Sequence, residues 1–310
     1  MPSRYPNGFK NGVTIRGLPL VQGVGGNVFW VNSTGGADSS AQAGTKERPF
    51  ATLDYAIGRC AANHGDVIYV APNHSETNTG ASAVTFDVAG VTVIGLGVAN
   101  QRPTFLLDAG TSVTWVVSAA DVKLKNLVLV AGHDGIVTAI DVAATNVTLE
   151  GLEFRQNTTA EHFLTAIKVT STTDNVADGL KIVGCRIYAF DTGFLEAIEI
   201  NGSIADLVVS ENIFYTLGTA SPLILLATGK IFTGLVCTRN LTQCANTTII
   251  WINCDGTTST GIVDGNLVSH LDTSGELLYT GTVGLHAGVN YASGVITASG
   301  YLLPAVYNDA

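Results

Sequence analysis

Aliphatic and polar side chains alternate in short runs along most of the chain, which is the periodicity of β-strands. One such run is written three times in nearly the same letters, as TAIDVA at 138–143, TAIKVT at 165–170 and EAIEIN at 196–201. Runs that return after about thirty residues are typical of solenoids, in which each repeat forms one coil. The pattern therefore predicts stacked coils with strands at equivalent positions.

A second alternating motif recurs between these runs and strengthens the prediction. Its copies are Val91-Val93-Leu96, Val122-Leu124-Leu127-Leu129, Val147-Leu149-Leu152-Phe154, Leu180-Ile182-Cys185-Ile187, Leu207-Val209-Asn212-Phe214 and Leu235-Cys237-Asn240-Thr242, and the stretch 261–271 reads as one more. A single coil cannot bury its apolar side, whereas stacked coils can, because each pairs with its neighbours. We therefore expect an all-β fold, a right-handed parallel β-helix (solenoid), with coils over 72–285.

Asparagine recurs at one position of this motif, at Asn212, Asn240 and Asn266. Two interpretations stay open. The side chains could point inward and form a ladder of hydrogen bonds along the axis, as in stacked strands. Alternatively, each asparagine could adopt the left-handed conformation of a turn.

The two ends of the chain have other patterns. Residues 27–71 predict an N-terminal cap: a strand over 28–32, a helix over 53–62 with Thr52 as its N-cap, and a strand over 66–71. An amphipathic helix over the end of a β-helix would protect its open strand edges. Residues 1–26 predict an extended N-terminal arm. Residues 286–310 lose the coil period and predict a segment that packs on the last coil or on partner subunits.

The stretch "FWVNSTGGADS…GTKERPFATLDYAIGRC…GDVIYVAP" resembles the first segment of pectate-lyase-like β-helix proteins. That superfamily includes polysaccharide lyases, glycoside hydrolases and phage tailspikes, so the resemblance implies an architecture and leaves the activity open. The run NGFKNGVTIRGLPL in the first 26 residues resembles the N-terminal segments of virion structural proteins from tailed phages. Phage β-helix proteins are usually homotrimers, and the resemblance implies the same here.

Composition narrows the classes of partner. Charged residues make up only 13% of the chain, which indicates a large buried fraction or apolar surface hidden against partners. The net charge is −10 and no basic stripe occurs, so we expect no nucleic-acid partner. No apolar stretch reaches the length of a membrane span, and no secretory signal is visible. The five cysteines and six histidines show no metal spacing, so we expect no metal and no cofactor.

Catalytic chemistry finds few candidates. Pectate-lyase-type elimination needs clustered carboxylates around calcium with a basic residue nearby, and Arg155 and Arg186 stand beside no such cluster. Hydrolysis needs two carboxyls about 5–10 Å apart. If the protein is an enzyme, the residues to consider are Asp191, Glu196 and Asp206; a second set comprises Glu150, Glu153, Glu161 and His162.

These observations favour a structural role. We expect a bacteriophage capsid decoration (cement) protein without enzymatic activity, which the resemblance implies to be a homotrimer. We expect it to be assembled in the host cytoplasm and located on the capsid surface of the virion. Its partners would be itself and the major capsid protein. The arm residues expected to bind the capsid are Tyr5, Phe9, Lys10, Ile15, Arg16, Leu18 and Leu20. The alternatives are a short tailspike or polysaccharide-degrading β-helix enzyme, and a non-catalytic adhesin that binds glycan.

Overall fold

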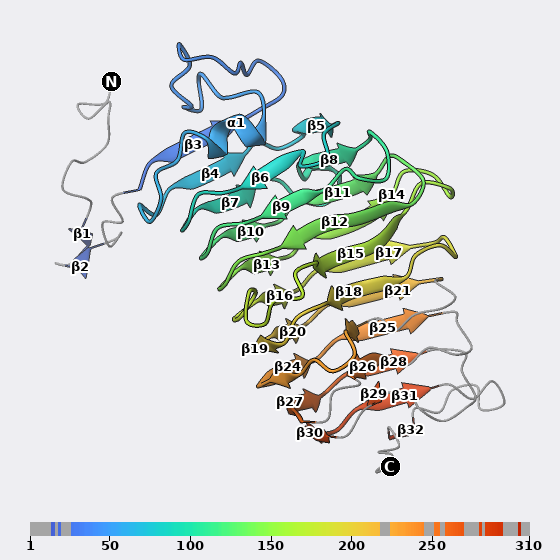
Figure 1. The fold of residues 1–310 in the computed structure, drawn as a ribbon. Helices are drawn as coiled ribbons and strands as arrows, with labels where there is room; N and C mark the ends of the chain where they lie inside the picture. Colours follow the sequence, from blue (N-terminus) through green and yellow to red (C-terminus); the bar gives the residue numbers. More distant parts are fainter. Residues whose placement is uncertain are drawn as a thin grey trace.

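The chain is a parallel β-solenoid whose coils stack along one axis (Figure 1). The computed structural model describes residues 14–15, 18–19, 26–217, 224–244, 251–254, 258–269, 279–280, 283–293 and 303–304. Each full coil contributes one strand to each of three sheets, and strands in successive coils pair in parallel. The predicted all-β solenoid is confirmed.

Sheet 1 has ten strands and carries the first half of the second sequence motif. Its strands are β3 (Val28–Val31), β4 (Val67–Val70), β7 (Thr92–Gly95), β10 (Lys123–Lys125), β13 (Thr148–Glu150), β16 (Lys181–Val183), β20 (Val208–Ser210), β24 (Leu235–Thr238), β27 (Ser259–Asp264) and β30 (Val283–Ala287). Leu124, Leu149 and Ile182 lie opposite one another in register and are fully buried. This row is one wall of the core.

Sheet 2 carries the second half of the same motif and also has ten strands. They are β5 (Ser75–Asn78), β8 (Thr104–Leu107), β11 (Val128–Ala131), β14 (Glu153–Gln156), β17 (Arg186–Ala189), β21 (Ile213–Thr216), β25 (Leu241–Cys244), β28 (Leu267–Ser269), β31 (Tyr291–Ser293) and the antiparallel β32 (Leu303–Pro304). Its inward row contains Phe105, Leu129, Phe154, Ile187 and Phe214 in register. The motif thus forms two strands joined by a turn.

Sheet 3 carries the repeated hexapeptides and has eight strands. They are β6 (Val84–Phe86), β9 (Trp115–Val117), β12 (Ile136–Val142), β15 (Phe163–Val169), β18 (Glu196–Ile200), β22 (Ile224–Leu226), β26 (Ile252–Cys254) and β29 (Tyr279–Thr280). Thr138, Thr165 and Glu196 pair in register, as do Ile140, Ile167 and Ile198, so the three hexapeptides stack as expected. A short parallel pair, β19 (Ile204–Ala205) and β23 (Phe232–Thr233), lies between sheets 3 and 1 in the chain.

The asparagines form a buried ladder, so the first of the two interpretations is confirmed. Asn212, Asn240 and Asn266 are at most 2% exposed, and Asn290 extends the row by one coil. The side-chain oxygens of Asn240, Asn266 and Asn290 each accept from the backbone N–H and the side-chain amide of the asparagine in the preceding coil, at 2.9–3.1 Å. The oxygen of Asn212 accepts from the backbone N–H of Cys185 at 2.8 Å. The left-handed conformation falls one residue earlier, at Glu211, Arg239 and Gly265 among others.

The N-terminal cap contains a shorter helix than predicted. Helix α1 covers Leu53–Ile57, begins at the predicted N-cap Thr52, and buries Leu53, Ala56 and Ile57 against β3, β4 and β6. It ends at Gly58, where the predicted helix continued to 62. A 3-10 turn, η1 (Ala99–Gln101), is the other helical element among the residues that the structure describes. Among the three tryptophans, Trp115 and Trp251 are fully buried and Trp30 is half-buried.

The arm residues Tyr5, Phe9, Lys10, Arg16 and Leu20 lie outside the described residues. Ile15 and Leu18 pair in the backbone of a two-stranded antiparallel ribbon, β1 (Thr14–Ile15) and β2 (Leu18–Pro19). At the other end, β30 crosses the predicted boundary at position 285, and the coil pattern continues into β31. The capsid-binding role of the arm stays a prediction.

Candidate functional site

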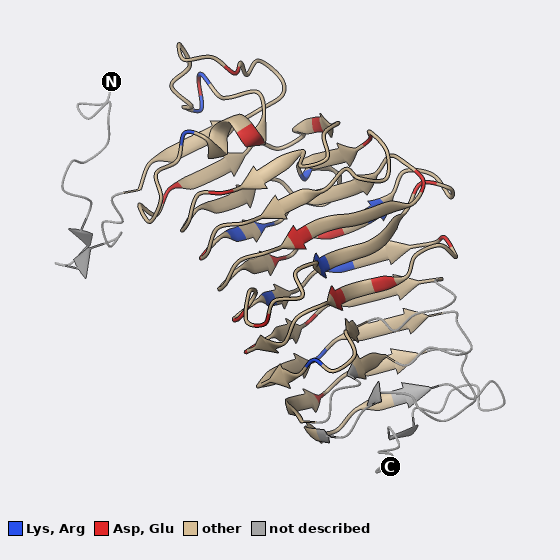
Figure 2. Cartoon of the chain, in the orientation of Figure 1, with Lys and Arg blue, Asp and Glu red and all other residues tan. Residues whose placement is uncertain are grey.

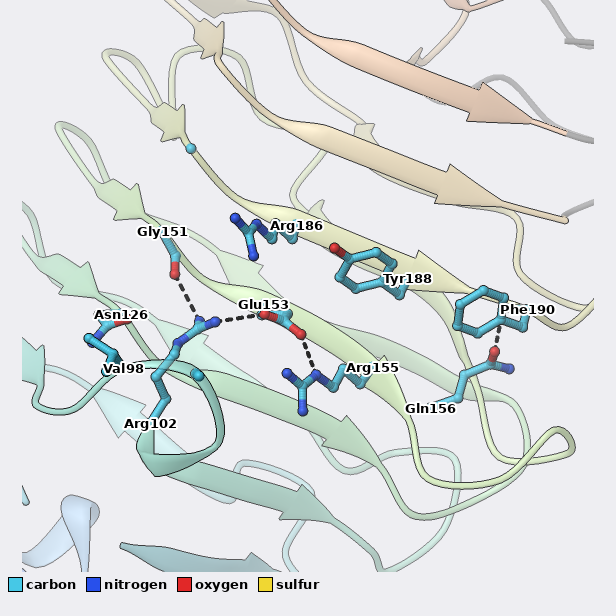
Figure 3. Close-up of a pocket in the computed structure, with 12 residues that line it drawn as sticks. Val98, Arg102, Asn126, Gly151, Glu153, Arg155, Gln156, Arg186, Tyr188 and Phe190 are labelled. Carbon is cyan, nitrogen blue, oxygen red and sulfur yellow. Dashed lines mark hydrogen bonds and ion pairs between the residues drawn. The ribbon is translucent and has the colours of Figure 1, made fainter. Parts of the chain in front are cut away.

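A groove of about 650 Å³ lies on the outward surface of sheet 2 (Figure 3). It crosses successive coils in the N-terminal half of the solenoid. Its lining residues are Val98, Ala99, Arg102, Asn126, Gly151, Glu153, Arg155, Gln156, Gly184, Arg186, Tyr188 and Phe190. They come from the η1 segment, from strands β14 and β17, from the turns that precede β11, β14 and β17, and from Phe190 directly after β17.

A buried ion pair forms the floor of the groove. Arg102 follows η1 and is only 9% exposed, and Glu153 opens strand β14 and is 3% exposed. The Nη1 atom of Arg102 lies 2.6 Å from Oε2 of Glu153, while Nη2 donates to the carbonyls of Leu127 and Gly151. Phe154 occupies the core side of β14, so the neighbouring Glu153 points outward and is buried by its arginine partners.

Two further arginines surround the same carboxylate. The Nε of Arg155 donates to Oε1 of Glu153, and the Arg155 side chain stays 45% exposed. Arg186 lies opposite Glu153 in register on β17 and is exposed. Within the part of the chain that the structure describes, no carboxylate pairs with Arg186. Figure 3 shows Glu153 between Arg102 and Arg155, with Arg186 on the adjacent strand.

Aromatic rings extend the groove along β17 and β21. The rings of Tyr188 and Phe190 stack with their planes 12° apart and their centroids 6.4 Å apart. The ring centroids of Phe190 and Tyr215 are 5.3 Å apart. Phe190 is 49% exposed. The backbone N–H of Phe190 donates to Oε1 of Gln156, which fixes the orientation of that amide. The exposed ring of Phe190 and the half-buried rings of Tyr188 and Tyr215 provide a stacking surface for a flat or ring-shaped ligand.

Donors outnumber acceptors in the groove. Three arginines and one glutamate give its lining a net charge of +2, in a chain of net charge −10. Arg102 Nε and Gln156 Nε2 are buried and have no hydrogen-bond partner, which is unusual for polar atoms inside proteins. The arrangement suits a ligand rich in acceptors. Glu153 is the sole carboxylate of this lining, whereas the usual hydrolysis of a glycosidic bond uses two.

The structure distributes the predicted catalytic residues over two corners of a coil. Asp191, between β17 and β18, accepts from the N–H of Gly193 at 2.6 Å and lies 3.6 Å from Nδ1 of His162. Glu196 is buried at the start of β18 and accepts from the Thr165 hydroxyl at 3.1 Å. Asp206 lies between β19 and β20, on the other side of sheet 3. Asp206 therefore belongs to a separate part of the surface.

The second predicted set is also dispersed. On sheet 1, Glu150 pairs with Lys123 at 2.6 Å and Lys125 at 2.5 Å, and these hydrogen bonds hold the pKa of Glu150 below its usual value. Glu161 accepts from Asn157, and His162 lies 3.3 Å from Asp134. Among these residues only Glu153 lines the groove. Arg155 and Arg186, the two arginines noted in the sequence, both line the groove.

Sequence reasoning missed Arg102, Gln156, Tyr188 and Phe190. The run RIYAF at 186–190 did contain a signal, because its first, third and fifth residues share one face of a strand and two of them are aromatic. Arg102 offered none, since its distance from Glu153 is 51 residues in the chain. Where the structure is described, no three His, Cys, Asp or Glu side chains gather closely enough to hold a metal. No helix among these residues has the length and apolar character to cross a bilayer.

Comparison with known proteins yields similarity in structure alone. No family model and no curated protein sequence matches the chain. A rhamnogalacturonan lyase superposes with a TM-score of 0.47 and 12% identity, covering 86% of this chain and 87% of its own. ORF18 of Geobacillus virus E2 superposes with a TM-score of 0.44 and 11% identity, covering 88% of this chain and 63% of its own.

A GH136 lacto-N-biosidase from Eubacterium ramulus gives a TM-score of 0.43 at 11% identity, covering 87% of this chain and 68% of its own. Identities this low are compatible with many activities on one architecture. The assignment of a parallel β-solenoid therefore depends on the strand pairing of this chain itself.

Proposed function

We propose that the chain is a non-enzymatic structural protein of a phage virion, a capsid decoration protein that works as a homotrimer. The observation that carries this proposal is an apolar row on the outward face of sheet 2. Ile213, Leu241, Leu267 and Tyr291 lie opposite one another in register across four successive coils. Leu241 is 42% exposed and Tyr291 43% exposed.

The apolar row is continuous enough to form an interface. A hollow of about 300 Å³ lies along it, lined by Ile213, Leu241 and Leu267 together with Tyr215, Gln243 and Ser269. Contiguous exposed apolar surface of this kind marks sites of protein association. Because the rows repeat with the coil spacing, copies of the same chain can pack side by side along the axis. This is the surface on which we place the trimer contact.

The interior supports a role as a rigid brace. The buried rows of all three sheets join in one apolar core, and the asparagine ladder ties successive coils together on the axis. A protein that binds only the assembled shell stabilises that shell by mass action. Three arms on one trimer would add effective concentration without strong single contacts.

The remaining parts of the proposal come from the sequence. The resemblance of 1–26 to virion proteins supports attachment to the major capsid protein through this arm. The resemblance of 28–71 to pectate-lyase-like proteins supports right-handed winding, which is also the general rule for parallel strand connections. We assign α1 the task of covering the first coil. Assembly would take place in the host cytoplasm, with the protein ending on the capsid surface.

Association through sheet 2 is tested with a matched pair of variants. Leu241→Asp places a charge in the apolar row, and Val137→Asp places one at a similarly exposed position on sheet 3, where Val137 is 46% exposed. Light scattering coupled to size exclusion should give a trimer for the wild type and for Val137→Asp, and a monomer for Leu241→Asp. A monomeric wild-type protein, or two variants that behave alike, contradicts this part of the proposal.

Attachment to the shell is tested by co-sedimentation. Full-length protein should pellet with capsids assembled from the major capsid protein of the same genome and raise their disassembly temperature. A protein lacking residues 1–26 should stay in the supernatant as an intact trimer. Release of reducing sugar or unsaturated oligosaccharide from bacterial polysaccharides by the purified protein would instead support the enzymatic alternative.

A further inference from the structure

We propose that the groove on sheet 2 is a binding site for an acidic glycan. In this site, anionic groups of the sugar pair with Arg155 and Arg186, and a sugar ring packs on Tyr188 and Phe190. This site is additional to the structural role and lies on the N-terminal coils of sheet 2. The apolar row assigned to the trimer begins on the next coil, at Ile213.

The charge balance of the groove indicates an anionic ligand. Glu153 already receives hydrogen bonds from Arg102 and Arg155, so its charge is more than neutralised. The exposed ends of Arg155 and the whole guanidinium of Arg186 are left for other acceptors. Guanidinium groups bind carboxylate and sulfate oxygens in pairs of parallel hydrogen bonds.

The side chains of the groove are held in fixed orientations, which supports a binding site and not a chance cluster of surface charges. Arg102 holds Glu153 from below through a 2.6 Å contact, and its own guanidinium is fixed by two backbone carbonyls. Glu153 in turn orients Arg155. The donor Gln156 Nε2, which has no partner, stands beside the aromatic rings. A ligand would therefore meet donors whose directions are already set.

The aromatic surface identifies the neutral part of the ligand. Tyr188 on β17 stacks with Phe190, the residue directly after this strand, and Tyr215 continues the surface on the following coil. The axial C–H groups of a pyranose pack on such rings. Arg186 and Tyr188 are two residues apart on one strand and so share its outward face. One sugar residue can thus contact a cation and a ring together, and the next residue can continue across the coils.

The experiment is calorimetric titration of the intact protein with four probes. These are an alginate oligosaccharide, a dextran sulfate oligosaccharide of similar length, neutral dextran, and single-stranded DNA. We expect binding of at least one acidic glycan, weakened by salt, and no binding of neutral dextran. The two acidic probes distinguish carboxylate from sulfate as the preferred anion. Equal binding of neutral dextran, or tighter binding of DNA than of either acidic glycan, overturns the proposal.

Variants locate the site. Arg186→Gln and Tyr188→Ala should each weaken binding of the preferred glycan about tenfold or more, as expected for loss of a charge-assisted hydrogen bond or of a stacking surface. The control is Lys181→Gln, which removes an exposed cation from sheet 1 of the same coil and should leave the affinity unchanged.

Circular dichroism of each variant ensures that a loss of affinity is not a loss of fold. If folded Arg186→Gln and Tyr188→Ala bind as the wild type does, the groove is not the site. The outcome is independent of the proposed capsid role, because oligomeric state and co-sedimentation are measured on the same variants and should not change.

Discussion

Replacing one asparagine of the buried ladder should lower the free energy of unfolding far more than replacing an asparagine on the surface. Asn240 occupies the middle of the ladder and is 2% exposed. Its oxygen accepts from the backbone N–H of Asn212 at 3.0 Å and from the Asn212 side chain at 2.9 Å. Its amide donates to the carbonyl of Val209 and to Oδ1 of Asn266 at 2.9 Å each. Asn240→Ala removes all four bonds.

The magnitude follows from the groups left behind. In Asn240→Ala, the backbone N–H of Asn212 and one N–H of its side-chain amide lose their acceptor inside the core. An unsatisfied buried polar group costs about 1–3 kcal/mol. Two such groups, with a small allowance for relaxation, give an expected loss of about 2–4 kcal/mol in the free energy of unfolding. Asn157→Ala, at an exposed turn position, should change it by less than about 0.5 kcal/mol.

Two measurements check this prediction. Denaturant unfolding followed by the fluorescence of the buried Trp115 and Trp251 gives the change in stability. Hydrogen exchange then tests the mechanism, because the amide of Asn212 should lose protection in Asn240→Ala while amides in the coils nearer the N-terminus keep theirs. The double variant Asn212→Ala/Asn240→Ala should lose less unfolding free energy than the two single variants lose together, since neighbours in one hydrogen-bond network are coupled.

The ladder hypothesis fails on either of two results. One is a stability loss in Asn240→Ala that matches the loss in Asn157→Ala. The other is a large loss with unchanged exchange at Asn212, which would assign the effect to packing and not to the hydrogen bonds.

Three further predictions concern buried ionisable groups. Asp66 is fully buried, which by itself raises its pKa, but hydrogen bonds from two backbone N–H groups and His64 outweigh burial and lower it. The stability contributed by this ionised carboxylate is present above the ordinary aspartate pKa of about 3.9 and is lost as the pH falls below it, so the gap in melting temperature between wild type and Asp66→Asn should be widest near neutral pH and shrink in acid. Burial raises the pKa of Cys185 to about 12 and raises that of Cys237 as well, so a thiol reagent at neutral pH should modify both only after unfolding; modification of the folded chain at either would contradict this. Glu153→Gln should lower the unfolding free energy by about 3–5 kcal/mol because it leaves Arg102 buried without its counter-charge, and a melting curve like that of the wild type would refute this.

The stacking of the coils could be predicted from the sequence because every coil needs apolar side chains at the same inward positions. A residue such as Leu149 must be apolar to face the core, and the same holds for Leu124 and Ile182 beside it. The alternation of apolar and polar residues can therefore be recognised in the sequence. The end of helix α1 was harder to predict, because the helical spacing of apolar residues continues to Cys60 while the helix ends at Gly58.

The groove was harder to predict because its parts come from different coils with no constraint to repeat. Arg102 and Glu153 meet only through the stacking of β8, β11 and β14, so neither residue signals the other in the sequence. In the sequence, paired carboxylates such as Asp191 and Glu196 are the pattern that indicates a hydrolytic site. The structure instead gathers arginines around a single carboxylate, Glu153, and this arrangement leaves no pair of acids in the sequence.

The outward face of sheet 2 explains how one solenoid can carry two separate surfaces. Inward positions are fixed by packing in every coil, whereas outward positions are free to change from coil to coil. One register column reads Glu153, Arg186, Ile213, Leu241 and Leu267 in order, so its character changes from ionic to aliphatic between β17 and β21. The two parts share a sheet and meet at Tyr215, which lines the hollow beside Leu241 and also contacts Phe190 of the groove. Leu241 lies one coil beyond Tyr215 and Arg186 one coil before it, so a change at Leu241 should affect association and leave glycan affinity intact. A change at Arg186 should do the reverse. Loss of both properties in either variant would mean that the coils between them transmit a structural change, which the independent rows of this solenoid do not predict.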